Sequence, residues 1–196
     1  MTESERITRL FRDLFDGDPW LDVQILSTLQ GINAEQAGRR IAEGRNTIWE
    51  IVNHLTSWRR NILDRLKGKF IPSPEHNYVL PVEDTSEEAW QRAQRELRDS
   101  QEEWLRYLEG LSDEDLDRTG SGKDKTPYYY YIHGMLQHDA YHLGQIVLLA
   151  KQDLDPLSVE ELEARITLLE TEIVRVKAKL EFAVHFRSTA DELFRK

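Results

Sequence analysis

Apolar residues recur every three or four positions through most of the chain, which is the period of an amphipathic helix. The pattern predicts a first helix in two pieces, residues 3–15 and 19–31, separated by the turn DGDP. Three longer helices are predicted at about 46–68, 85–110 and 127–151, the last after a polar loop at 121–126. Four amphipathic helices of this size predict an all-α four-helix bundle.

Cap residues and prolines predict where the longer helices begin and what joins them. Asn46 or Thr47 can cap the second helix, and Thr85 or Ser86 can cap the third. Residues 69–84 contain three prolines and no helical period. They predict a long crossover between helices two and three.

Composition narrows the class of protein and of partner. Of the 196 residues, 39% are hydrophobic and 32% are charged, which suits one globular domain with an appendage. The net charge of −10 argues against nucleic acid or an anionic membrane as partner. The absence of cysteine excludes disulfides, thiolate metal ligands and a cysteine nucleophile. No run of about 18–20 apolar residues is present, and the amino terminus lacks a signal-peptide core, so we expect a cytoplasmic protein.

Three of the six histidines are predicted to face the bundle interior. His138 and His142 lie four apart in the fourth helix, on a stripe with Met135, Gln145 and Leu149. His54 lies on the inward stripe of the second helix. Neutral imidazoles suit zinc, nickel, iron or copper, and three protein ligands leave a coordination position open. The alternative is three core histidines, each satisfied by its own hydrogen bond.

These residues also carry a resemblance to a known family. The segments TIWEIVNHLTSWRRNILDRLKG and, much later, HDAYHLGQI resemble the DinB/YfiT-like superfamily over about residues 1–152. The resemblance implies a DinB-like four-helix bundle in which His54, His138 and His142 bind one divalent metal, most simply zinc or nickel. It also implies two reaction types on a small-molecule substrate: transfer that depends on a low-molecular-weight thiol cofactor, and metal-dependent hydrolysis.

Several residues near the histidines are candidates for supporting roles. Gln145 is placed to hydrogen-bond a ligand histidine, and Gly144 to allow close helix packing. Trp58 and Tyr141 are candidates for the pocket wall, with core packing as the alternative. Asp139 is expected to face outward, with an approach to the ring nitrogen of a neighbouring ligand as the alternative. Neither a carboxylate pair nor a serine–histidine–aspartate arrangement is evident, so the catalytic residues stay unassigned.

The last part of the chain predicts a second unit, with the boundary between domains 1–154 and 155–196. Taking Val159 as heptad position a, apolar residues fill the a and d positions: Val159, Leu162, Ile166, Leu169, Ile173, Val176 and Leu180. This pattern favours a parallel two-stranded coiled coil, hence a homodimer. The segment also resembles a family of short bacterial coiled-coil proteins of unknown function. A helix folded back on its own bundle is the alternative, and a non-catalytic assembly protein with a metal-stabilised bundle is the alternative function.

Overall fold

The protein folds into two units, each described here by itself. The computed structural model describes residues 1–69, 71–120, 125–152, 154 and 157–194. Contacts between Cα atoms separate Met1–Gln152 from Asp153–Lys196. Every extended regular element of the described residues is a helix, which confirms the all-α prediction. None of these helices is long and apolar enough to cross a membrane.

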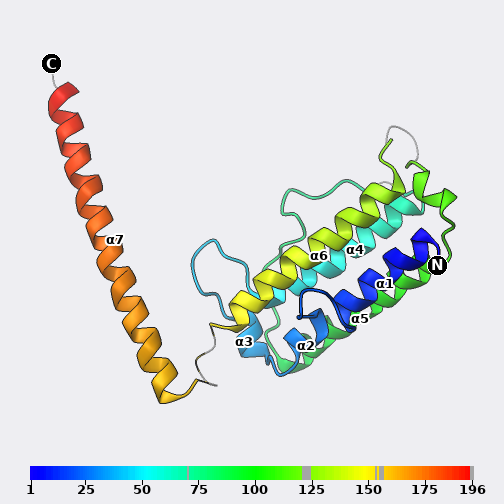
Figure 1. Ribbon diagram of the computed structural model, residues 1–196, viewed down its shortest axis with the longest axis horizontal. Helices are drawn as coiled ribbons and strands as arrows, with labels where there is room; N and C mark the ends of the chain where they lie inside the picture. The colour runs from blue at the N-terminus through cyan, green and yellow to red at the C-terminus, as the bar shows by residue number, and fades with distance from the viewer. Residues whose placement is uncertain (70, 121–124, 153, 155–156, 195–196) are drawn as a thin grey trace. The chain divides into compact units, whose positions relative to one another are not determined.

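The first unit is a bundle of four long helices. These are α1 (Glu3–Phe15), α4 (Ile48–Leu66), α5 (Glu87–Glu109) and α6 (Tyr128–Ala150). Both α5 and α6 contact α1 as well as α4. Figure 1 shows α4 alongside α6, and α1 alongside α5. The predicted bundle with a long connection between its second and third long helices is therefore confirmed.

Local signals start the long helices where the sequence predicted. Thr47 caps α4 through a capping box, because its hydroxyl accepts from the Glu50 amide while the Glu50 carboxylate accepts from the Thr47 amide. Ser86 caps α5 by accepting from the amide of Ala89. The polar loop predicted at 121–126 lies largely outside the described residues.

The connection between α1 and α4 differs from the prediction of a helix at 19–31, which is wrong. Only α2 (Ile25–Leu29) forms there, followed by α3 (Ala34–Gly38). Asp22 and Gly31 adopt positive φ angles of 57° and 82°, which a right-handed helix does not allow. The apolar residues before α2, among them Trp20 at 97% exposure, therefore lie at the surface. After α5, a 3₁₀ turn at Glu114–Asp117 leads toward α6.

The bundle core consists of two hydrophobic clusters. One gathers Trp49, Trp90, Leu97, Leu143 and their neighbours, and the other gathers Phe11, Trp104, Ile132, Met135 and theirs. Along α4, α5 and α6, a buried polar group lies between the residues of the two clusters: Arg59, Ser100 and Asp139. The clusters hold the helices together, and the polar layer between them lies beside the histidines described next.

The second unit contains one long helix, α7 (Val159–Phe194). Ser158 begins it with reciprocal hydrogen bonds to Glu161, another capping box. Leu162 is half-buried, and the other six residues of the predicted a and d positions are exposed.

Candidate metal centre

His54 from the middle of α4 meets His138 and His142 from the middle of α6. One ring nitrogen from each of the three lies within 4.8 Å of the others. Nε2 of His54 lies 2.9 Å from Nε2 of His138. A tetrahedral zinc with Zn–N bonds of about 2.0–2.1 Å needs nitrogens about 3.4 Å apart. The cluster therefore has a size that suits one metal ion.

Hydrogen bonds at the opposite ring nitrogens indicate which atoms of two histidines are free to coordinate. Nδ1 of His54 donates to the backbone carbonyl of Asn77 over 2.7 Å, because a carbonyl can only accept. Nδ1 of His142 lies 2.7 Å from Oε1 of Gln145. The Gln145 amide in turn donates to the Tyr141 hydroxyl, so its oxygen is the acceptor for His142. Both rings therefore keep the Nε2 lone pair, the state in which imidazole binds a metal.

The third histidine lies against a buried ion pair. Arg59 and Asp139 are each 1% exposed, and their Nη2 and Oδ2 atoms are 2.7 Å apart. The second oxygen of Asp139 lies 3.7 Å from Nδ1 of His138, and neither atom has a hydrogen-bond partner. Without metal, the 2.9 Å contact with His54 requires the His138 proton on Nε2, because His54 already donates from Nδ1. A metal bound at this Nε2 would move the proton to Nδ1, where it would face the carboxylate oxygen. Two unsatisfied buried atoms thus fit the tautomer that a metal requires.

The position of Asp139 corrects the expectation that it faces outward. The apolar stripe of α6 is centred on Ile132, Met135, Leu143 and Ile146. Asp139 falls on this stripe, while His138 lies at its edge and is half-buried. The buried carboxylate is stabilised because Arg59 on α4 neutralises its charge and also donates to Ser100.

Burial and mutual repulsion favour neutral imidazoles. Desolvation, together with the nearby His138 and His54 rings, lowers the pKa of His142 to about 4. Desolvation also lowers the pKa of His54. For Asp139, burial is the largest single influence and opposes ionisation, but Arg59 and His138 together outweigh it, so the pKa lies below its ordinary value. His54 and His142 are therefore favoured as neutral rings, in a site whose carboxylate already has its charge paired with Arg59.

The other predicted site residues have different roles. Gln145 makes the expected hydrogen bond to His142. Trp58 is half-buried, with its ring centroid 6.0 Å from that of His138, and its indole donates to Asn77. Tyr141 is 63% exposed, so it does not pack in the core, but its ring contacts that of His142 with centroids 5.0 Å apart. Gly144 is exposed and a Cβ there would meet nothing within 4 Å, so the expected close helix packing is wrong.

An open hollow of about 450 Å³ begins one helical turn from the histidines. It is lined by Ile51 of α4, by Gln145, Leu148 and Leu149 of α6, and by the segment before α4, including Arg45. Gln145 thus belongs both to this hollow and to the support of His142. An apolar group of a small molecule would fit against Ile51 and the two leucines.

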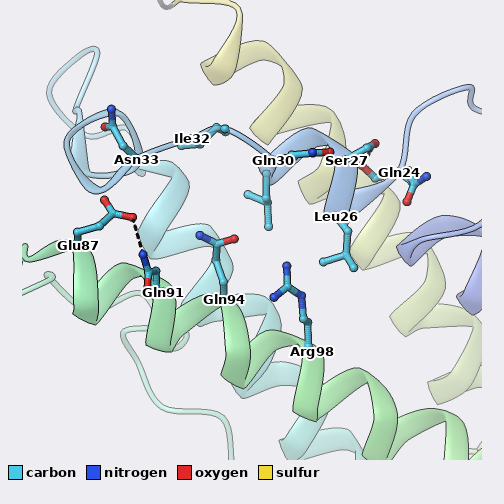
Figure 2. A pocket seen from close by; sticks show the side chains of 12 residues that line it. Gln24, Leu26, Ser27, Gln30, Ile32, Asn33, Glu87, Gln91, Gln94 and Arg98 are labelled. Carbon is cyan, nitrogen blue, oxygen red and sulfur yellow. Dashed lines mark hydrogen bonds between the residues drawn. The ribbon is translucent and has the colours of Figure 1, made fainter.

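A second hollow lies between α2, the segment that follows it, and α5 (Figure 2). Its volume is about 640 Å³, and most of its polar side chains are amides. Arg98 extends from α5 toward α2, while Glu87 accepts a hydrogen bond from Gln91. Among the described residues the histidine cluster is the one that combines buried ligand atoms with lowered pKa values, so it is the stronger candidate.

Comparisons with known proteins give two family matches and a similar solved structure. The family model of the DinB superfamily matches residues 23–146, and that of a protein family of unknown function, DUF1192, matches residues 143–195. The crystal structure of a DinB-like protein from Bacillus cereus ATCC 10987 is similar, with a TM-score of 0.48 and 19% identity. That similarity covers 77% of this chain and 85% of the other. No curated protein matches the chain.

Proposed function

Because the chain belongs to the DinB superfamily, we propose that its bundle binds one divalent transition metal through His54, His138 and His142. Zinc and nickel are the metals that we favour, since three neutral imidazoles suit both. The observation that carries the proposal is the convergence of the three rings, with two of them held by hydrogen bonds at Nδ1.

We further propose that the bound metal serves an enzyme acting on a small molecule, either a transferase that uses a low-molecular-weight thiol or a hydrolase. A metal with an open position would lower the pKa of a thiol or a water molecule bound there. The protein's own part is to hold the three rings and to receive the substrate. Gln145 keeps His142 in its coordinating tautomer, and the hollow beside it offers an apolar wall formed by Ile51, Leu148 and Leu149.

Metal content of the purified protein tests the ligand set. We expect about one equivalent of metal in the wild type and a large loss in His142→Ala. His133→Ala is the matched control, because His133 lies on the same helix but packs against the ring of Tyr129, outside the cluster. Equal metal content in the wild type and in His142→Ala would refute the triad.

Activity requires a separate experiment. The metal-loaded and metal-free wild type would be compared with electrophilic substrates in the presence of low-molecular-weight thiols, and with ester or amide substrates in their absence. Turnover that depends on the metal and is lost in His54→Ala supports an enzyme. Metal binding without turnover favours the second candidate, a non-catalytic assembly protein, for which the unpaired apolar face of α7 is the specific observation.

A further inference from the structure

The apolar face of α7 has no partner among the described residues of its own unit. Over the described part of that unit, α7 is the one regular element. Its a and d positions include Ile166, Ile173 and Leu180, all more than half exposed. A helix of 36 residues with such a face is not stabilised by burial unless something covers it. The question is which partner fits.

The charged residues that flank this face fit an identical helix lying parallel to it. In a parallel pair, a residue at g meets the residue at the next e position of the other helix. Arg165 would meet Glu170 of the second copy, and Glu172 would meet Lys177. Each pairing occurs twice by symmetry, and all of them are between opposite charges. The a positions are valine, isoleucine, isoleucine and leucine, with leucine, leucine and valine at d, which favours two strands.

An antiparallel pair would place like charges together. When the a and d layers of two antiparallel copies are matched, g residues meet g residues and e residues meet e residues. Arg165 would then meet Lys179, while Glu172 and Glu170 would each meet their own symmetry mates. Of the pairings in that register, Glu163 with Lys177 alone is attractive. The charge pattern therefore selects the parallel orientation.

We propose that α7 is a dimerisation helix that pairs with α7 of a second copy of this chain as a parallel two-stranded coiled coil. The contact spans about residues 159–180 and joins two bundles into one particle. This inference does not depend on metal binding, because it rests on α7 alone.

The mass of the full-length protein in solution, measured by light scattering, tests the pairing. We expect twice the chain mass of 23.1 kDa. Ile173→Glu places a charge at the a position and raises the dissociation constant by about 100-fold or more. Val174→Glu is the matched control, since this neighbour is apolar and exposed but lies at position b. A monomeric wild type, a larger assembly, or equal effects of the two substitutions would overturn the proposal.

The absence of native cysteines allows a direct test of orientation. Leu162→Cys, at a d position near one end of the contact, faces itself in a parallel pair but faces position 180 in the antiparallel register. Mild oxidation should therefore link Leu162→Cys chains into a covalent dimer. Ala164→Cys, at the outward f position, should remain largely unlinked. If neither variant links, or both link equally, the parallel contact is wrong.

Discussion

Replacing Asp139 by asparagine tests how much the buried Arg59–Asp139 pair contributes to the stability of the fold. The substitution preserves shape but removes the charge, and so leaves the guanidinium of Arg59 buried without a counter-ion. Breaking a buried pair in this way costs about 3–5 kcal/mol of unfolding free energy. For a chain of this size, that corresponds to a fall in Tm of roughly 6–20 °C.

The assay is chemical denaturation of the metal-free protein, followed by tryptophan fluorescence and circular dichroism. Glu109→Gln is the matched control, because it removes the partner of Arg12 from an exposed ion pair between α1 and α5. Exposed pairs contribute about 0–1 kcal/mol, so this variant should unfold almost as the wild type does. If Asp139→Asn costs no more than Glu109→Gln, the reasoning about the buried pair is wrong.

A double variant distinguishes stability from ligand support. Arg59→Met combined with Asp139→Leu removes both charges and fills similar volume, which is often close to neutral for stability. Metal affinity should nevertheless stay weaker by about 10–100-fold, because the carboxylate facing Nδ1 of His138 is lost. Competition with a chromophoric chelator measures that affinity. Recovery of wild-type affinity together with stability would contradict a positioning role for Asp139.

Three further predictions concern the metal centre. Removing metal with a chelator should lower the Tm of the wild type, whereas His142→Ala should show little change. The metal-free protein should lose stability as pH falls from about 6.5 toward 4. In this range His142 binds a proton in the unfolded chain but not in the folded protein, where its pKa is about 4. His142→Gln should make stability depend less on pH over this range. Gln145→Ala should weaken metal binding by about tenfold, because His142 loses the acceptor at Nδ1, while Gln137→Ala, at an exposed glutamine of the same helix, should bind nearly normally.

The long helices and the meeting of the three histidines were predictable because both depend on short-range spacing. Thr47 marks the start of α4 as a capping residue. The spacing of four residues between His138 and His142 places both rings near one face of α6. His54 could be added because the stripe of α4 is clear. Each of these features can be predicted from the pattern of a single helix, together with the assumption that the apolar faces of the helices meet in the core.

The buried ion pair could not be predicted in the same way. The sequence favours an outward Asp139, since carboxylates are rarely buried without a partner, and leaves its approach to a ligand ring as the alternative. Its partner Arg59 lies 80 residues earlier in the chain, and nothing local marks the two as a pair. The one indication in the sequence was that each of two apolar stripes contains a charged residue, Arg59 on α4 and Asp139 on α6. The helix predicted at 19–31 does not form because Asp22, inside that range, has a positive φ, which the apolar pattern does not reveal.

The crossover between α4 and α5 is more than a connection, because its Asn77 accepts from His54 and from Trp58. Asn77 and Tyr78 both have positive φ, an arrangement that persists where surrounding contacts compensate for its cost. If this loop conformation strengthens ligand binding at His54, thermodynamic linkage requires that ligand binding stabilises the loop conformation by the same free energy. The loop is thereby a built-in reporter: occupancy of the centre should slow hydrogen exchange at the Asn77 and Val79 amides and change the emission of Trp58.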